Sequence, residues 1–175
     1  MSSVSLFRTS ILRGIAAGCS AACCLLIHSA ATEVMAEEPP KELGIWYDDT
    51  GRGAIRISQC GSQLCGHIHW LKSAVNSAGE ILHDVNNPDP AARRRPICGM
   101  QVFGKLVSNG NGSWEGGWIY DPKVGKSYDV QIRQLSDDAL EVHGYAGIKM
   151  FGKTFIWRRA PDDLPACELT GANAN

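Results

Sequence analysis

Hydrophobic and polar residues alternate along most of the chain with the period of two that is typical of half-buried β-strands. In one such run Ile55 and Ile57 fall on one face, and Arg56 and Ser58 fall on the other. No segment keeps the period of an amphipathic helix over ten residues. Eight runs are predicted to be strands: Leu43–Tyr47, Ala54–Ser58, Leu64–Leu71, Val102–Val107, Trp114–Tyr120, Ser127–Gln134, Leu140–Ile148 and Thr154–Arg159.

Residues that favour tight turns separate most of these runs. Asp48–Gly51 is a turn cluster, two Asn-Gly pairs occupy positions 109–112, and Asp121–Gly125 contains proline followed by glycine. Short strands at hairpin spacing are typical of an antiparallel sandwich or a closed up-and-down barrel. The pattern therefore predicts an all-β domain.

One of the predicted strands carries two histidines. Alternation along Leu64–Leu71 places Leu64, Ile68 and Trp70 on one face, with His67 and His69 on the opposite face. A His-x-His pair has a spacing that can hold a metal. Because the other face is apolar, we expect the two imidazoles to point to solvent, and the sequence predicts neither a metal nor a cofactor.

A long connection, from Lys72 to Pro96, interrupts the series of hairpins. Its prolines exclude a central strand, and Asp89 is placed to cap a short helical turn over residues 90–94. Loops of this length in compact domains are often functional. Arg93 and Arg95 can grip an anionic ligand at the barrel mouth. Alternatively, they pair with aspartates and hold the loop in place: Asp84, Asp89 or Asp121.

The N-terminal residues have the pattern that is typical of an export signal. Arg8 and Arg13 precede a charge-free run over residues 14–27, and small residues allow cleavage after Ala31 or Ala36. The run is shorter than the roughly 20 residues that span a bilayer. The predicted organisation is a signal peptide (1–36), a short linker (37–42), one barrel domain (43–160) and a C-terminal tail (161–175). We expect a periplasmic or secreted protein with no membrane span after cleavage.

Net charge and cysteine content exclude some classes of function and indicate disulfides. Cleavage after Ala36 leaves a net charge of about −2, without the basic face that nucleic-acid binding requires. Four cysteines remain, an even number that indicates disulfides in an exported chain, with three possible connectivities. Cys60 and Cys65 bracket a tight turn, so we favour a bridge between them, which leaves Cys98 to pair with Cys167. A zinc site fits this spacing poorly.

Irregularly spaced motifs then suggest a family. They read Asp84-x-Asn86-x-Pro88-Asp89-Pro90-x-x-Arg93-x-Arg95-Pro96-x-x-Gly99, then Trp114-x-Gly116-Gly117-x-x-Tyr120-Asp121-Pro122-x-x-Gly125-Lys126-x-Tyr128, then Gly144-Tyr145. Over roughly 44–160 the chain resembles the bacterial secreted family catalogued as domain of unknown function 2147. The resemblance implies a single eight-stranded lipocalin-like (calycin) β-barrel, without an established activity.

The two ends of the barrel sequence agree with such a fold. Gly44-x-Trp46 opens the first strand, and Trp157-Arg158-Arg159 closes the last. Calycin barrels resemble this arrangement, in which a basic side chain from the final strand covers a tryptophan at the barrel floor. The attraction is that of a cation for an indole face. A barrel of eight strands has room for its own side chains or for one small ligand.

The sequence shows no catalytic apparatus that spacing can identify, because it lacks a Gly-x-Ser-x-Gly elbow and a triad pattern. We therefore favour a non-catalytic binding or structural barrel that takes a small or anionic molecule near its mouth. An envelope enzyme using Asp84, Arg93 and Arg95, or a metal carrier using the histidines, is the alternative. The candidate ligand-binding residues are Asp84, Asn86, Arg93, Arg95, Trp114, Tyr120, Asp121 and Tyr128. No oligomeric state is predicted.

Overall fold

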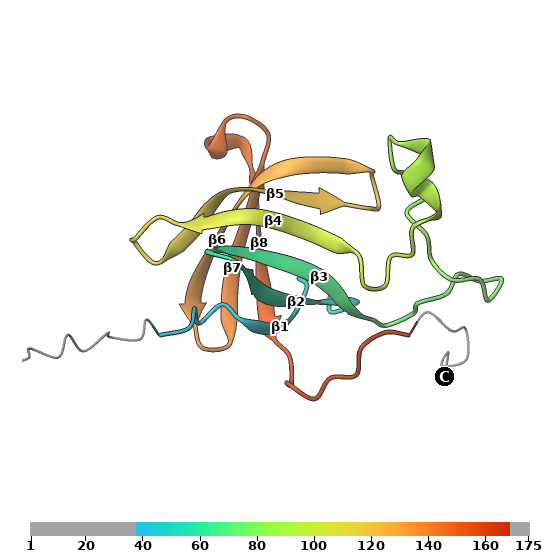
Figure 1. Ribbon diagram of the computed structural model, residues 1–175, viewed down its shortest axis with the longest axis horizontal. Helices are drawn as coiled ribbons and strands as arrows, with labels where there is room; N and C mark the ends of the chain where they lie inside the picture. The colour runs from blue at the N-terminus through green and yellow to red at the C-terminus, as the bar shows by residue number, and fades with distance from the viewer. Residues whose placement is uncertain (1–37, 169–175) are drawn as a thin grey trace, which may run out of the picture. The chain divides into compact units, whose positions relative to one another are not determined.

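The computed structural model describes residues 38–168, so the predicted signal peptide and residues 169–175 of the predicted tail lie outside the described residues. The described chain forms a closed antiparallel barrel in which each strand pairs with the next, and the last pairs with the first (Figure 1). This confirms the predicted single eight-stranded barrel. The strands are β1 (Gly44–Tyr47), β2 (Gly53–Cys60), β3 (Gln63–Leu71), β4 (Gln101–Ser108), β5 (Ser113–Asp121), β6 (Lys126–Ser136), β7 (Ala139–Tyr145) and β8 (Lys153–Arg159).

Two short 3-10 helices complete the described elements. η1 (Pro90–Arg94) lies in the β3–β4 connection, where a helical turn was predicted, and η2 (Lys149–Phe151) lies between β7 and β8. Within residues 38–168 no helix is long and apolar enough to cross a bilayer. The run predicted as one strand over Leu140–Ile148 ends early, because the chain turns away after Tyr145 through Gly147, whose φ is +71°.

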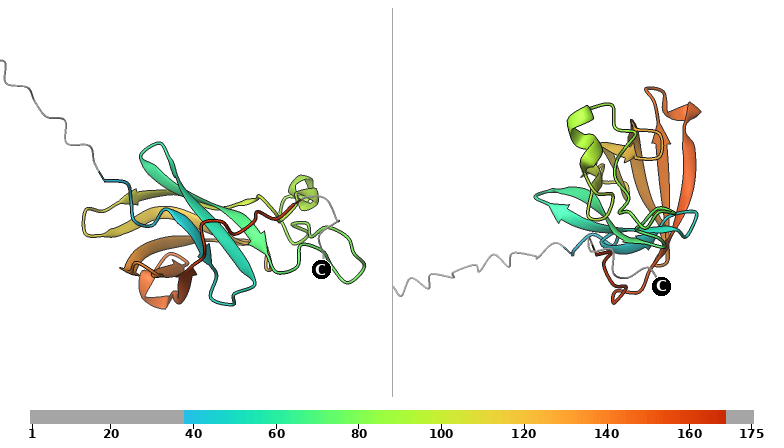
Figure 2. Two further views of the ribbon diagram at one scale, coloured as in Figure 1. Left: turned by 90° about the horizontal axis from the view of Figure 1, so that it is seen from below. Right: turned by 90° about the vertical axis from the view of Figure 1, so that its right-hand side faces the viewer.

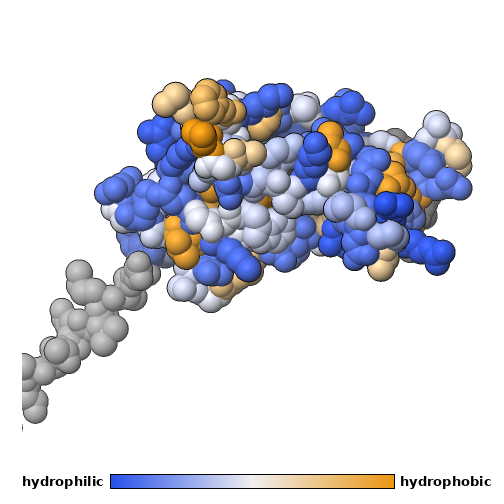
Figure 3. Space-filling model, turned by 90° about the horizontal axis from the view of Figure 1, so that it is seen from above, coloured by the Kyte–Doolittle hydropathy of each residue, from blue (hydrophilic) through white to orange (hydrophobic). Residues whose placement is uncertain are grey.

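Large apolar side chains fill the interior of the barrel. Phe103 and Trp157 meet inside it with ring centroids 6.2 Å apart. Around them one contiguous cluster of buried residues extends, whereas the face seen in Figure 3 is largely hydrophilic. Burial of this apolar area is the main favourable term in folding. The most deeply buried members of the cluster include Trp46, Leu64, Leu106, Val130, Ile132, Leu140 and Val142.

One end of the barrel, called here the floor, is closed by Arg159. Its guanidinium carbon stands 4.0 Å from the ring centroid of Trp46, which is fully buried. The indole Nε1 of Trp46 donates to the carbonyl of Glu42 at 2.8 Å. A side chain at Gly44 would place its Cβ 2.8 Å from Nη1 of Arg159, so glycine leaves room for the cation. The arrangement expected from the Gly-x-Trp and Trp-x-Arg sequences is confirmed.

Trp70 lies on the outer face of the barrel, not with Leu64 and Ile68 as the alternation predicted. Ile55 pairs with Ile68, but the adjacent Ala54 pairs with Trp70, so β3 carries one extra residue at this point. A bulge of one residue reverses the face of every side chain beyond it. Leu64 and Ile68 contact the core, whereas Trp70 packs in a separate outer cluster.

The C-terminal segment 160–167, called here the strap, covers that outer cluster. Leu164 packs against it, and the backbone N–H of Cys167 donates to the carbonyl of His69 at 2.6 Å. In Figure 2 (left) the dark red strap crosses the outer side of the first strands. A disulfide joins Cys167 to Cys98, and a second disulfide joins Cys60 to Cys65 across the β2–β3 turn. The favoured cysteine pairing is therefore confirmed.

The connections β1–β2, β3–β4, β5–β6 and β7–β8 join the strand ends opposite the floor, called here the mouth, as the up-and-down order requires. The β3–β4 connection is much the longest, running from Leu71 to Gln101. It contains only η1 and two isolated bridges, Val75–Ile81 and His83–Pro96. It lies beside the β5–β6 turn at the right of Figure 1.

Candidate functional site

Asp84, in the long β3–β4 loop, is fully buried and receives three side-chain hydrogen bonds. The hydroxyl of Tyr120 donates to Oδ1 at 2.7 Å. The amide of Asn87 and Nη2 of Arg95 both donate to Oδ2, each at 2.7 Å. The backbone N–H of Asp84 also donates to the carbonyl of Arg95 at 2.9 Å. A buried carboxylate needs such partners, because an unpaired one would carry a large desolvation penalty.

The local chemistry of the loop explains how Arg95 comes to face Asp84. Asp89 caps η1, with Oδ1 accepting from the backbone N–H of Ala91 at 2.9 Å, as predicted. The side-chain Oδ1 of Asn87 accepts from the N–H of Asp89, and the backbone carbonyl of Asn87 accepts from Nε of Arg93 at 2.8 Å. The chain therefore doubles back within a few residues, and Arg95 returns beside Asp84.

Two further contacts attach this loop to the β5–β6 turn. The amide of Asn86 donates to the carbonyl of Lys123 at 2.9 Å. The backbone carbonyl oxygen of Asn86 lies so close to Gly125 that a Cβ there would clash with it. Gly125 also has φ +66°, a conformation that favours glycine. The loop and the turn therefore fit only because residue 125 has no side chain.

The electrostatics of this network hold each group in one protonation state. Burial raises the pKa of Asp84, but the hydrogen bonds from Asn87, Tyr120 and Arg95 outweigh it and bring the pKa below the ordinary value of 3.8. Burial, together with the bond to the Asp84 carboxylate, raises the pKa of Tyr120 to about 12. At neutral pH Asp84 is therefore ionised and Tyr120 protonated, which suits a fixed structural network better than proton transfer.

The structure brings some of the predicted ligand-binding residues together and separates others. Asp84, Arg95 and Tyr120 form the network above, with Asn86 and Arg93 in the same loop. Asp121 lies in the β5–β6 turn, where Oδ1 accepts from the N–H of Lys123 at 2.9 Å. Trp114 and Tyr128 lie on the wall instead, paired with Ile132 and Ile119 respectively.

His67 and His69 do not form part of a metal-binding cluster in the described chain. Nε2 of His69 lies 2.8 Å from the carbonyl oxygen of Leu164 in the strap, and its Nδ1 lies 3.4 Å from Nε of Arg56. Within residues 38–168 no three His, Cys, Asp or Glu side chains are arranged to hold a metal ion. His69 thus helps to fasten the strap to the barrel.

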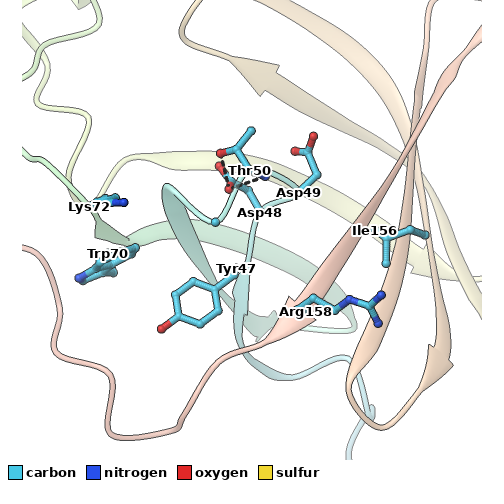
Figure 4. Close-up of a pocket in the computed structure, with 9 residues that line it drawn as sticks. Tyr47, Asp48, Asp49, Thr50, Trp70, Lys72, Ile156 and Arg158 are labelled. Carbon is cyan, nitrogen blue, oxygen red and sulfur yellow. Dashed lines mark hydrogen bonds between the residues drawn. The ribbon is translucent and has the colours of Figure 1, made fainter.

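A groove on the outer wall, near the mouth, is a concave feature that the alternation pattern did not predict. β1 is short and pairs with β8 only through Trp46–Arg159 and Tyr47–Arg158. The earlier part of β8 therefore runs past the end of β1 beside the β1–β2 turn. The space has a volume of about 730 Å³ and is lined by Tyr47, Asp48, Asp49, Thr50, Gly51, Trp70, Lys72, Ile156 and Arg158 (Figure 4).

The groove combines aromatic and cationic side chains. Tyr47 and Trp70 meet edge to face with ring centroids 5.7 Å apart. Lys72 and Arg158 form no ion pair within residues 38–168. Asp48 is occupied within the turn, where Oδ1 accepts from the Thr50 hydroxyl at 2.8 Å, and Figure 4 shows these bonds at one side of the groove. Two flat rings and two unpaired cations can hold a small acid with an apolar body.

Sequence reasoning missed this groove for an identifiable reason. Tyr47 and Arg158 were assigned only to strands, and Trp70 was assigned to the inner face. The sequence carried no clear signal for it, because the predicted first and last strands, Leu43–Tyr47 and Thr154–Arg159, are of nearly equal length, and only the structure shows that β1 is much shorter than β8.

Comparisons with known proteins agree with the fold. Residues 44–159 match the model of the family described as an uncharacterized protein conserved in bacteria, domain of unknown function 2147. A solved structure from Helicobacter pylori, protein HP1028, described as belonging to the lipocalin family, superposes with a TM-score of 0.61 at 25% sequence identity. The similarity covers 73% of this chain and 86% of that one. A search of curated protein sequences found no match.

Proposed function

We propose that this chain, which belongs to the bacterial family called domain of unknown function 2147, is a non-catalytic binding protein of the cell envelope built on a lipocalin-like barrel. In this proposal the ligand is a small organic acid, and it binds in the outer groove near the mouth. A family and a fold do not specify a ligand, so the proposal depends on the chemistry of the groove itself.

The observation that carries the proposal is the lining of the groove. The interior of the barrel is occupied by Trp46, Phe103, Trp157 and their aliphatic neighbours, which directs the search for a site to the outer wall. There the space of about 730 Å³ falls within the range of roughly 300–1,000 Å³ that small-molecule sites occupy. It is open to solvent, as an exchangeable site requires.

The chemistry of the lining suggests the class of ligand. The apolar part of a small acid would lie against Tyr47 and Trp70, where ring faces offer contact area at low entropic cost. Its carboxylate, sulfonate or phosphate would accept hydrogen bonds from Lys72 and Arg158. Asp49, on the turn, would disfavour ligands with several negative charges.

Export is part of the same proposal and rests on the N-terminal sequence. Arg8, Arg13 and the apolar run behind them support a cleaved signal peptide, and two disulfides in the barrel suit an oxidising compartment. N-terminal sequencing of the protein from an envelope fraction should find a start near Thr32 or Glu37. A start at Met1, or a lipid on a cysteine of the signal, would contradict this part.

An anionic aromatic probe tests the groove. We expect 8-anilinonaphthalene-1-sulfonate to bind, and the Lys72→Gln/Arg158→Gln variant to bind it several-fold more weakly, because both cationic contacts are lost. Lys126→Gln, which removes an exposed lysine on β6 outside the groove, is the matched control and should bind as the unchanged protein does. Equal affinities in all three proteins would show that the probe does not use this groove.

The loop arginines provide a second candidate for anion binding, because the Arg95 side chain keeps 46% of its surface exposed while paired with Asp84. The same titration with the Arg93→Lys/Arg95→Lys variant distinguishes the two sites. If this variant binds the probe more weakly while the Lys72→Gln/Arg158→Gln variant binds it as the unchanged protein does, the proposed site moves to the long loop.

A further inference from the structure

The β7–β8 connection presents three large apolar side chains to solvent within four residues. Ile148 is 60% exposed, Met150 is 85% exposed and Phe151 is 78% exposed. The connection stands at the top of Figure 1, and Figure 3 looks onto that side, where hydrophobic groups stand out among hydrophilic ones. Single exposed apolar residues are common, but a contiguous group usually marks a contact surface.

The backbone of this connection is tied down, so it holds the apolar side chains away from the barrel. Nε2 of His143 lies 2.8 Å from the carbonyl oxygen of Lys149, and its Nδ1 lies 2.8 Å from the hydroxyl of Thr154. The backbone N–H of Gly147 donates to Asp129 at 3.2 Å. A Cβ at Gly152 would stand 2.5 Å from the same His143 ring, so the loop packs closely on β7.

Within the connection itself the charged residues are basic, whereas Glu115 on β5 and Asp129 on β6 contact it from neighbouring strands. Lys149 and Lys153 flank Met150 and Phe151, and residues 146–153 contain no acid. Lys149 forms an ion pair with Glu115 at 2.9 Å, whereas Lys153 forms none within residues 38–168. Exposed apolar side chains flanked by lysine are the pattern by which proteins bind the surface of an anionic bilayer.

The size of the apolar group also favours a lipid surface over a protein. Three side chains of this kind expose on the order of 400 Å². A stable protein–protein interface needs about 800 Å² from each partner. A bilayer surface needs no matching shape and takes up individual side chains at its headgroup boundary.

We propose that Ile148, Met150 and Phe151 insert into the headgroup region of an anionic bilayer, with Lys153 against the lipid phosphates. This contact would seat the protein on an envelope membrane after export, with the β7–β8 connection facing the lipid. It does not depend on the outer groove, because it uses a different connection and different residues.

Vesicle sedimentation tests the proposal with the protein purified from the envelope of producing cells. We expect it to bind vesicles of phosphatidylglycerol and phosphatidylcholine more tightly than vesicles of phosphatidylcholine alone. The Met150→Ser/Phe151→Ser variant should bind at least tenfold more weakly, and Lys153→Glu several-fold more weakly. Leu135→Ser is the matched control, since Leu135 is 48% exposed near the floor, and it should leave vesicle binding unchanged.

A spectroscopic variant keeps the test independent of any loss of folding. In Phe151→Trp, the added indole should shift its emission to shorter wavelength when anionic vesicles are present. No shift on bound vesicles, or equal weakening by Leu135→Ser, would overturn the proposal. A dimer that dissociates in the Met150→Ser/Phe151→Ser variant, with no vesicle binding by the unchanged protein, would also overturn it and assign the surface to a second copy.

Discussion

The guanidinium of Arg159 lies 4.0 Å from the ring centroid of Trp46 and also donates hydrogen bonds to three backbone carbonyls. The acceptors belong to Lys41, Leu43 and Asp137, so one side chain joins the segment before β1, the β6–β7 turn and the end of β8. Because these segments are far apart in sequence, Arg159 fastens the floor at the point where the sheet closes on itself.

Replacing Arg159 by alanine should therefore lower the free energy of unfolding by about 2–4 kcal/mol, the combined loss of a cation–π contact and charge-assisted hydrogen bonds. Urea denaturation followed by tryptophan fluorescence measures this change. Arg158→Ala is the matched control. The side chain of Arg158 is exposed and has no ion pair within residues 38–168, so we expect its removal to change the free energy of unfolding by at most about 0.5 kcal/mol. Similar losses in both variants would contradict the role given to Arg159.

The second prediction concerns the hydroxyl of Tyr120. Tyr120→Phe leaves Oδ1 of the buried Asp84 without its donor, so the free energy of unfolding should fall by about 1–3 kcal/mol. Tyr145→Phe provides the control, because Tyr145 is partly buried and its hydroxyl has no hydrogen bond in the described chain. Chemical denaturation of the two variants compares them directly, and equal stability would mean that the hydroxyl contributes nothing to the loop.

The same network predicts a loss of stability at both extremes of pH. The folded-state pKa of Asp84 lies below 3.8, so its contribution is present above about pH 4 and is lost as the pH falls through the folded value. The pKa of Tyr120 is raised from 10.0 to about 12, so its contribution is present below about pH 10 and is lost as the pH rises toward 12.

The free energy of unfolding measured from pH 2 to 12 checks both the acid and the alkaline side of this stability curve, with variants as internal references. We expect Asp84→Asn to flatten the acid limb and Tyr120→Phe to flatten the alkaline limb, each relative to the unchanged protein. An acid limb that keeps its slope in Asp84→Asn would assign the titration to other carboxylates.

The fourth prediction concerns the strap. The Cys98–Cys167 disulfide has a sequence separation of 69, whereas Cys60–Cys65 has a separation of 5. On the loop-entropy model, replacing the first pair by serines should cost about 4 kcal/mol and replacing the second about 2 kcal/mol. Exchange of the backbone N–H at position 167 should also rise only in the first variant, because its hydrogen bond to the carbonyl of His69 depends on the strap. Equal protection there in both variants would show that the strap is held without its disulfide.

Much of the fold follows from patterns that are local in the sequence. The period of two, the turn residues and the short spacing of Cys60 and Cys65 each concern residues that are close in the chain, and they correctly predicted eight strands and the hairpin disulfide. The cap of η1 by Asp89 is local in the same way. Local geometry limits what such residues can do, so their types are sufficient to indicate the strands, the hairpin bridge and the helical turn.

The face on which Trp70 lies was decided by tertiary structure. The bulge opposite Ala54 and Ile55 depends on how β2 and β3 pair, and one extra residue in β3 is enough to move the indole from the core to the outer wall. The groove has the same origin, because it exists where β1 ends beside a longer β8. Neither feature can be read from the alternation of a single strand.

The long β3–β4 loop shows most clearly which features the sequence predicts and which depend on tertiary structure. The sequence alone indicated that Arg95 either binds an anionic ligand or pairs with one of three aspartates, Asp84, Asp89 or Asp121, and it left these possibilities open. The tertiary structure pairs Arg95 with Asp84 and adds Tyr120, which is 36 residues from Asp84 along the chain. A buried carboxylate needs donors from every side, and only the folded chain brings residues so far apart in sequence within 2.7 Å of its oxygens. The sequence by itself determined eight short strands joined mostly by tight turns, because these depend on neighbouring residues. The packing of distant segments decided which polar side chains are hydrogen-bonded in the interior and which stay exposed, because their partners come from other parts of the chain.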